Sequence, residues 1–333
     1  MDLFSFARRL IDVESITGNE AAVGELLAKE LSGLGFEVHR MPLPDEPARF
    51  NLVAVPRDNR HPPVVFSTHI DTVPPFFPSR EDGERIYGRG ACDTKGIIAT
   101  QVAASLKLRE QGVATGLLFV VGEETSAVGA KLANEHPIGS RFLINGEPTD
   151  NRLGIASKGT LRVEITCTGK MAHSAYPHLG ESAIEKLLDS LERVRAIPLP
   201  VHEKFGACTV NIGVIEAGRA ANVIPDRAYA LLFCRLIGSS GELRRQMVEA
   251  VGQWGEVVFA HETPFVELRS IEGLPTMMAA FATDIPWLGN WGQPLLLGPG
   301  SVHLAHTEDE HIRKSEMLEA VELYCDVVQK LLA

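Results

Sequence analysis

The sequence contains few cysteines, and their positions exclude two common kinds of stabilised scaffold. Only five cysteines occur among 333 residues, the number is odd, and no two form a CxxC pair. We therefore expect neither a disulfide framework nor a cysteine-rich zinc finger. Buried free thiols in a reducing compartment are the simplest interpretation.

Long apolar segments are absent as well. No run approaches the ~18 residues of a membrane-spanning helix, and the opening stretch MDLFSFARRLIDVES lacks the apolar core and cleavage site of a signal peptide. Positive charge is also scarce, with 32 Lys and Arg against 43 Asp and Glu, for a net charge of -11. We therefore expect a cytoplasmic protein whose main partner is neither nucleic acid nor a membrane.

Two easily recognised catalytic motifs are missing. The chain has no GxxxxGK(S/T) phosphate loop and no GxSxG nucleophile elbow. The stretch Gly88-Arg-Gly-Ala-Cys-Asp begins like a dinucleotide fingerprint, but it lacks the third glycine and carries an acidic residue where a pyrophosphate would lie. The chemistry must therefore come from other residues.

The length predicts two domains, because ~100–200 residues per domain is usual. Short apolar strands alternate with helices in the first part, which is typical of a sheet covered on both faces. We expect an α/β domain with a mixed, mostly parallel sheet covered by helices, built from residues 1–157 and 271–333. Its predicted helices cover 2–12, 20–34, 96–110 and 315–332, and its predicted strands cover 36–40, 51–56, 64–68, 117–121 and 142–145.

The pattern changes near Lys158. Residues 161–168 alternate between apolar and polar, as a half-exposed strand should. The elements that follow are helix 181–195, strands 208–215 and 228–236, helix 240–254 and strand 256–260. This β-α-β-β-α-β order is that of a ferredoxin-like α+β layer, so we expect residues 158–270 to form a separate domain inserted into the first.

Acidic and histidine side chains follow the ends of three predicted buried strands. They are His69, the pair Glu123-Glu124, and Glu147. Ligands of open α/β sheets bind at the carboxyl ends of the strands, so these side chains should converge. Asp93, just before a helix, and His306, in a glycine-rich segment, are further candidates. Any one of these features alone is usually a solvated turn, but the whole set together indicates a metal site.

Carboxylates and imidazoles without thiolates suit zinc or a similar divalent ion. Two such ions need about six protein ligand contacts. Four come from His69, Glu124, Glu147 and His306, and Asp93 supplies two if it bridges the ions. A bridged pair would lie ~3.5–4 Å apart, polarise a carbonyl and acidify a shared water.

Two carboxylates remain beside the predicted ligands. Glu123 would be the general acid/base. It would take a proton from the water shared by the two ions and pass it to the leaving nitrogen. Asp71 follows His69 by two residues and so shares its strand face. We expect Asp71 to hydrogen-bond the ligand imidazole and fix its orientation.

Five ordered motifs span almost the whole chain. They are Ser67-Thr-His-Ile-Asp-Thr-Val-Pro74, Tyr87-Gly-Arg-Gly-Ala-Cys-Asp-Thr-Lys-Gly96, Gly122-Glu-Glu-Thr125, Gly146-Glu-Pro-Thr149, and Gly298-Pro-Gly-Ser301 with Ala305-His306. With these motifs the chain resembles the acetylornithine deacetylase / succinyl-diaminopimelate desuccinylase family of dinuclear zinc peptidases and deacylases. The resemblance implies a zinc-peptidase-like catalytic domain, two divalent ions (zinc, or cobalt), the metal-site roles given above, and a non-prolyl cis peptide after Asp93.

The resemblance also implies roles that spacing alone does not. His173, in Lys170-Met-Ala-His-Ser-Ala, matches a lid histidine that stabilises the oxyanion in the partner subunit's active site. The implied substrate-binding residues are Asn222, Arg235 as the grip on an α-carboxylate, and Gly300 and Ser301 through their main-chain N–H groups. The inserted domain would act as a lid and form a homodimer. Lys158, where some members carry arginine, and His303 are given no role.

The resemblance implies hydrolysis of an N-acyl amino acid, most simply N²-acetylornithine to ornithine and acetate, a step of arginine biosynthesis. Alternatives with the same machinery are succinyl-diaminopimelate desuccinylation, acetylcitrulline or acetyl-lysine deacetylation, and dipeptide cleavage. A non-catalytic binding relative would lack ligands or the base, and both are present. A two-metal phosphatase would need basic residues around the ions, and Arg89 and Lys95 do not make that case.

Overall fold

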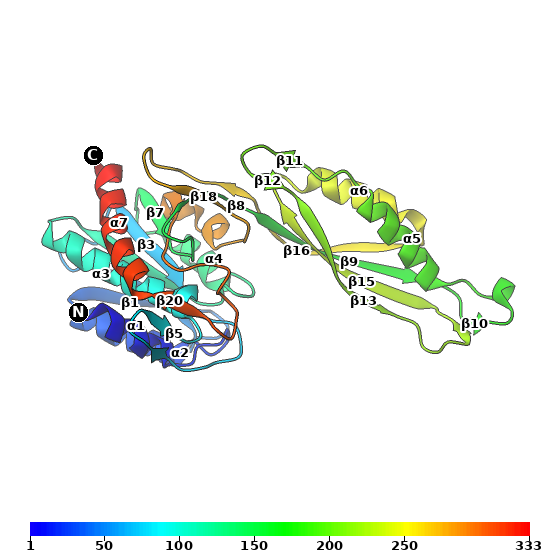
Figure 1. Ribbon diagram of the computed structural model, residues 1–333, viewed down its shortest axis with the longest axis horizontal. Helices are drawn as coiled ribbons and strands as arrows, with labels where there is room; N and C mark the ends of the chain where they lie inside the picture. The colour runs from blue at the N-terminus through cyan, green and yellow to red at the C-terminus, as the bar shows by residue number, and fades with distance from the viewer. The chain divides into compact units, whose positions relative to one another are not determined.

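The computed structural model describes all residues, Met1–Ala333. The chain forms two compact units (Figure 1). Unit 1 consists of Met1–Ile155, Leu268–Met277 and Thr283–Ala333, and unit 2 of Ala156–Glu267 and Met278–Ala282. No helix combines the length and hydropathy needed to cross a membrane.

Unit 1 contains a six-stranded sheet in the order β1-β2-β6-β3-β7-β19. These strands are β1 (Phe36–Pro42), β2 (Phe50–Pro56), β3 (Val64–His69), β6 (Thr115–Val120), β7 (Phe142–Asn145) and β19 (Gln293–Leu296). Strands β6, β3, β7 and β19 are mutually parallel, whereas β1 and β2 pair antiparallel. The predicted mixed, mostly parallel sheet is confirmed.

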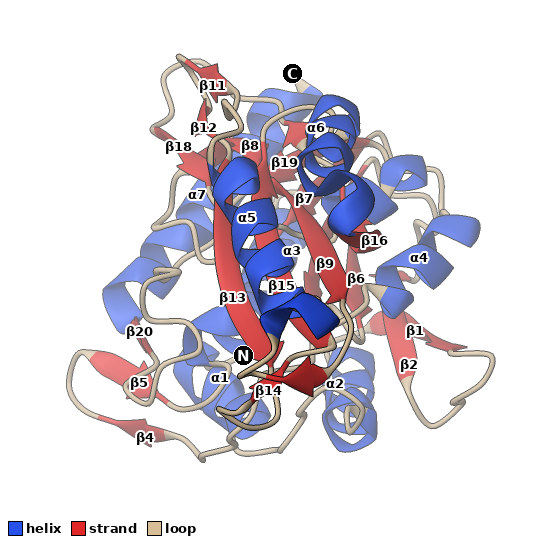
Figure 2. Ribbon diagram, turned by 90° about the vertical axis from the view of Figure 1, so that its right-hand side faces the viewer, coloured by secondary structure: helices blue, strands red, loops and turns tan.

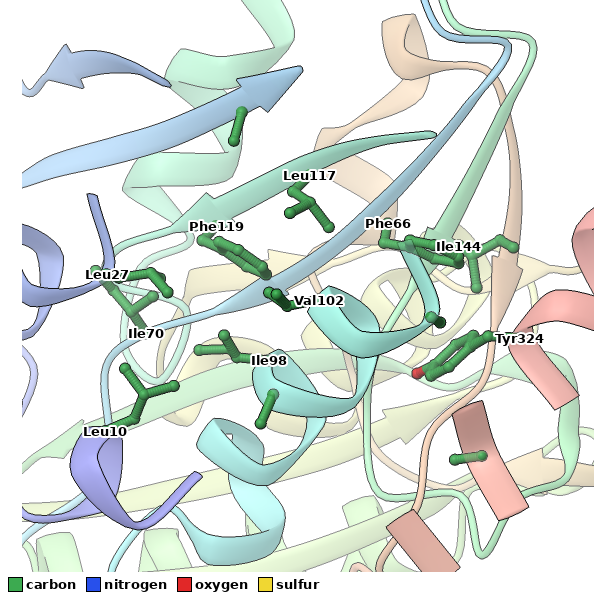
Figure 3. Packing of buried hydrophobic residues seen from close by; sticks show 14 of the residues in the cluster. Leu10, Leu27, Phe66, Ile70, Ile98, Val102, Leu117, Phe119, Ile144 and Tyr324 are labelled. Carbon is green, nitrogen blue, oxygen red and sulfur yellow. The ribbon is translucent and has the colours of Figure 1, made fainter. Parts of the chain in front are cut away.

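Helices cover both faces of this sheet because its central strands are apolar on both sides. Phe66, Leu117 and Ile144 pack in a cluster with α1, α2, α3 and α7, while the alternate residues Val65 and Leu118 pack in a second cluster with α4. The helices are α1 (Leu3–Ile11), α2 (Ala21–Gly33), α3 (Gly96–Glu110), α4 (Val128–Glu135) and α7 (Lys314–Leu332). Figure 3 shows α3 side chains meeting those of the strands in the first cluster.

Short strands complete unit 1 and the connections to unit 2. A small sheet in the order β20-β5-β4 contains β4 (Arg80–Glu81), β5 (Arg85–Tyr87) and β20 (His311–Arg313). The strands β8 (Leu153–Ser157), β17 (Val266–Glu267) and β18 (Thr276–Ala279) lie where the chain passes from one unit to the other.

Unit 2 contains a four-stranded antiparallel sheet in the order β13-β15-β9-β16, with α5 and α6 on one face (Figure 2). Its elements are β9 (Gly159–Thr168), β10 (Ala172–His173), α5 (Ala183–Arg195), β11 (Val201–His202), β12 (Gly206–Ala207), β13 (Thr209–Ala217), β14 (Val223–Ile224), β15 (Arg227–Leu236), α6 (Gly241–Val251) and β16 (Gly255–Thr263). Alternate residues of β9 and β15 are fully buried under the helices, as in Val163 and Leu232. The predicted ferredoxin-like layer is confirmed.

Candidate metal centre

The carboxyl ends of three neighbouring strands carry the predicted site residues. Strand β3 is hydrogen-bonded to β6 on one side and β7 on the other, and all three run parallel. His69 ends β3, Glu123 and Glu124 follow β6, and Glu147 follows β7. Because parallel strands end at the same edge, these residues come together at one place, as expected.

Asp93 lies at the centre of this group. Its Oδ1 is 3.0 Å from Nε2 of His69, and its Oδ2 is 3.3 Å from Nε2 of His306. Oε1 of Glu124 lies 3.2 Å from the same nitrogen of His306. The Asp93–Thr94 peptide bond is cis, as predicted. Each oxygen of Asp93 therefore faces a different imidazole, which is the arrangement expected of a carboxylate that bridges two cations.

The donor set fits divalent metal ions. Potential ligand atoms of His69, Asp93 and Glu124 all lie within 4.8 Å of one another. Glu147 is buried, and its Oε1 has no hydrogen-bond partner in the chain. A buried carboxylate oxygen without a donor is costly, and a cation at this position would satisfy it. Glu147 and His69 could thus hold one ion and Glu124 and His306 the other, with Asp93 between them.

In the metal-free site, the imidazoles of His69 and His306 bind protons and are positively charged. Burial opposes the charged form of His69, but hydrogen bonds to Asp71 and Asp93 outweigh it and raise its pKa well above the ordinary value. Hydrogen bonds to Asp93 and Glu124 raise the pKa of His306 to about 10. Burial raises the pKa of Asp93, yet the two histidines more than reverse this, so that its pKa is lowered. The two protonated imidazoles therefore offset part of the negative charge of the carboxylates.

Asp71 contacts the His69 imidazole and also holds the turn that carries Glu123 and Glu124. The closest partner of the His69 Nδ1 atom is the main-chain oxygen of Asp71, at 2.9 Å, whereas the carboxylate oxygen is 3.6 Å away. The carboxylate also accepts the main-chain N–H groups of Glu123 and Glu124, at 3.1 and 3.2 Å. It also accepts the hydroxyl of Thr17 at 2.7 Å. Asp71 thus orients the imidazole through its backbone and the Glu123-Glu124 turn through its side chain.

Glu123 has the properties of a general base. Its side chain is partly exposed and has no hydrogen-bond partner in the chain, so a water or a substrate can reach it. Although part of the side chain stays accessible, the burial of its carboxyl group and the nearby carboxylates of Glu147 and Glu124 raise its pKa well above the ordinary value. A raised pKa favours acceptance of a proton and its later donation.

Two residues near the site, Thr17 and Asp284, are not predicted from the sequence. Thr17 lies far from Asp71 in the chain, and nothing in its surroundings in the sequence marks it. Asp284 is fully buried, and neither of its carboxylate oxygens has a partner. Burial raises the pKa of Asp284 to about 7, and the charges of His69, Asp71 and Glu124 also act on it. Asp284 directly precedes a short 3-10 helix, Ile285–Trp287, and nothing in the sequence there marks a buried carboxylate.

Gly300 and Ser301 lie beside the metal site. Gly300 has a φ of +84°, and a Cβ atom there would approach the Cβ of Cys92 to 2.7 Å, so glycine is required. The main chain of Ser301 pairs with Thr149, and its hydroxyl donates to Asp150 at 3.4 Å. His303 is exposed. The predicted contact of Gly300 and Ser301 with a carboxylate stays a prediction.

Unit 2 carries the remaining predicted residues at two opposite ends of its sheet. His173 in β10 pairs with Val223 in β14, which places it beside Asn222. Arg235 lies near the far end of β15, roughly 25 Å along the strand from Arg227 at ~3.3 Å per residue. The Arg235 guanidinium lies 5.0 Å from the ring of Phe233 and forms no ion pair or hydrogen bond in the chain. Lys158 donates to the main-chain oxygen of Ala207 at 2.6 Å, a structural contact.

The fold and the donor set define a metal-dependent hydrolase with a two-layer accessory unit. The chain matches the sequence profile of "Peptidase family M20/M25/M40" over residues 65–330, and it belongs to this family. The profile describes the whole family and is not specific to its acetylornithine deacetylase branch.

Similar proteins cover nearly the whole chain. A peptidase M20 domain-containing protein of Schizosaccharomyces pombe is 37% identical, with 97% of this chain and 83% of the relative aligned. A probable carboxypeptidase of Aspergillus fumigatus is also 37% identical, over 99% of this chain and 87% of the relative. The structure of aminopeptidase PepT from Bacillus cereus superposes with a TM-score of 0.82 at 22% identity, covering 99% and 98% of the two chains. The YXEP protein of Bacillus subtilis, described as a dinuclear metal-binding peptidase, gives 0.69 at 16% identity over 98% of each chain.

Proposed function

We propose that this protein hydrolyses an amide bond on the acyl side of an amino acid that carries a free α-carboxylate. The observation that carries the proposal is Asp93, which presents one oxygen to His69 and the other to His306 beside the unpartnered base Glu123. Two divalent ions, when bound to these residues, would polarise the scissile carbonyl and acidify a water. Zinc suits the mixed imidazole and carboxylate donors, and cobalt is a close substitute.

The residues of the chain would divide the work of the reaction. Glu123 takes a proton from the attacking water and delivers it to the leaving nitrogen, because its carboxylate is free and its pKa is raised. Asp71 holds the Glu123 main chain in place through the 3.1 Å hydrogen bond. The attacking group is a water, so the reaction needs no nucleophilic side chain. This agrees with the lack of a serine or cysteine motif.

Arg235 supports a substrate with a carboxylate. Its guanidinium is half-buried, burial lowers its pKa, and no acidic side chain of the chain neutralises it. A planar guanidinium without a partner is suited to bidentate binding of a carboxylate. Several relatives are named probable carboxypeptidases, and a carboxypeptidase releases a C-terminal residue that carries a free α-carboxylate. Asn222, Gly300 and Ser301 are the other residues that we propose to contact the substrate.

Within this reaction class the leading substrate is N²-acetylornithine, on the resemblance of the five motifs. Succinyl-diaminopimelate, acetylcitrulline, acetyl-lysine and dipeptides are alternatives, and the names of the relatives add peptides with a free C-terminus. These substrates share the amide bond and the α-carboxylate. They differ only in the acyl group and the side chain.

We further propose that the protein acts as a homodimer. His173 and Asn222 lie at one end of the unit 2 sheet and Arg235 at the other, so one copy of unit 2 cannot surround a small substrate with all three. A second copy could supply the His173 end. The imidazole would then stabilise the oxyanion that forms in the partner's site.

A substrate panel with a matched control tests the proposal. Metal-free protein is loaded with zinc or cobalt and assayed on each of these substrates and on acyl amino acids whose carboxylate is replaced by a carboxamide. We expect turnover of at least one carboxylate substrate, and loss of most kcat/KM for its carboxamide. Arg235→Met should lose the same discrimination. Equal rates on carboxylate and carboxamide would contradict the role of the carboxylate, and no hydrolysis of any substrate would contradict the function.

A further inference from the structure

Glu310 connects a buried arginine to the backbone of the central metal-site carboxylate. Its Oε1 accepts the main-chain N–H groups of Cys92 and Asp93, each at 3.3 Å. Its Oε2 lies 2.5 Å from Nη1 of Arg89. The exposed fractions of the two side chains are 2% for Arg89 and 0% for Glu310. Both charges are therefore completely removed from water.

Both partners are held firmly by other parts of unit 1. The Nε atom of Arg89 donates to the main-chain oxygen of Pro75 at 3.2 Å, and its guanidinium lies 4.8 Å from the ring of Phe77. The main-chain oxygen of Glu310 accepts the N–H of Gly88 at 3.1 Å, next to the pairing of β20 with β5. The Glu310 carboxylate is thus held by Arg89, which is itself held by Pro75 and Phe77.

A buried ion pair is poor evidence for stabilisation by itself. Removing two charges from water costs several kcal/mol per ion, and apolar replacements of similar volume are often as stable. What this pair provides, and an apolar pair cannot, is an acceptor for the N–H groups that precede the Asp93 side chain. Hydrogen bonds behind a ligand generally fix its orientation toward the metal.

We infer that Glu310 is a positioning residue for the bridging ligand Asp93, and that Arg89 compensates the charge of Glu310. The inference rests on the proposed metal centre but not on the identity of the substrate. Glu310 holds the Asp93 main chain so that the two oxygens of that side chain face His69 and His306. Without Glu310 the Asp93 side chain would have the same chemistry but a looser orientation, and the metal affinity would fall about 10–100-fold.

The test replaces the pair while keeping its volume. The double variant Arg89→Met/Glu310→Met is compared with Arg49→Met/Glu20→Met, which removes another buried ion pair of unit 1 that accepts no hydrogen bond from a ligand main chain. Cobalt affinity is measured by titration of the visible absorption spectrum, alongside the thermal midpoint. We expect the first variant to lose cobalt affinity about 10–100-fold with an altered spectrum, and the second to bind cobalt like the wild type.

Several outcomes separate this inference from the proposed function. Wild-type cobalt affinity and spectrum in folded Arg89→Met/Glu310→Met would overturn the inference, because the pair would then be merely structural. If that variant does not fold, Arg89→Leu/Glu310→Leu decides, since it also removes the acceptor of the Cys92 and Asp93 N–H groups; unchanged cobalt affinity in that variant again overturns the inference. Wild-type protein that binds two cobalt ions but hydrolyses no substrate would contradict the function alone. Wild-type protein that binds no cobalt would overturn both.

Discussion

The main-chain N–H of Glu123 donates a hydrogen bond of 3.1 Å to Oδ1 of Asp71. The same carboxylate accepts the N–H of Glu124 at 3.2 Å. One aspartate thus fixes the backbone of a turn from which Glu124 faces a histidine ligand, while the preceding Glu123 stays free. This explains how adjacent residues can serve two different roles, which an extended strand would not allow.

The free carboxylate of Glu123 leads to a first prediction. Glu123→Gln removes the proton acceptor but keeps the size of the side chain and the bond to Asp71, so kcat should fall by about 10²–10⁴-fold. The metal content, measured by elemental mass spectrometry, should equal that of the wild type. Glu124→Gln is the matched control, because it should lose metal as well as activity. Wild-type turnover by Glu123→Gln would exclude its role as the base.

The main features of the site could be predicted from the sequence because they depend on local patterns. Apolar runs that end in His69, Glu124 and Glu147 place these residues at strand ends, and parallel pairing brings the ends together. The side-chain role of Asp71 could not be predicted, because it depends on the turn at Gly122, whose φ is +75°. The Thr17 contact depends on tertiary packing alone.

Two elements of unit 1 lack the usual sequence signals. The helix α4 is only eight residues long and begins after Ala127, which has a positive φ and no capping side chain. The strand β19 contains Pro294, which normally argues against a strand. Proline is tolerated here because β19 is an edge strand that pairs only with β7.

Metal binding should release protons from the histidines. Hydrogen bonds to Asp93 and Glu124 raise the pKa of His306 to about 10, so the metal-free imidazole holds a proton at neutral pH. An ion bound at Nε2 must displace that proton, so the affinity should rise about tenfold per pH unit up to the pKa. Competition with a chelator at pH 6, 7 and 8 measures this dependence. An affinity that is the same at all three pH values would contradict the protonation of His306.

Asp284 should make the metal-free protein less stable at higher pH. Its pKa is about 7 in the folded protein and 3.8 as an ordinary carboxyl, so the folded state keeps a proton that the unfolded state releases. Stability is therefore complete below pH 3.8, falls as the pH rises through 7, and then levels off. Asp284→Asn cannot ionise and breaks no hydrogen bond, since both oxygens lack partners.

Urea unfolding of the metal-free proteins at pH 5 and pH 8 checks this expectation. The quantity to compare is the unfolding free energy of Asp284→Asn minus that of the wild type. This difference should be larger at pH 8 than at pH 5 by on the order of 2 kcal/mol. Asp150→Asn is a suitable control, because this exposed carboxylate has no comparable burial. The same difference between variant and wild type at both pH values would mean that Asp284 does not titrate in this range.

The separation of His173 from Arg235 within unit 2 gives a prediction about subunit mixing. If His173 acts in the partner's site, a heterodimer of His173→Ala and Glu123→Gln subunits contains one site with both residues intact. Random assortment of equal amounts should restore about a quarter of the wild-type kcat, although each variant alone is nearly inactive. The control mixture pairs Glu123→Gln with Arg235→Ala, and its outcome shows whether Arg235 acts on its own subunit's site or the partner's. If the His173→Ala mixture stays as inactive as its parents while light scattering shows mixed dimers, His173 does not act across the dimer.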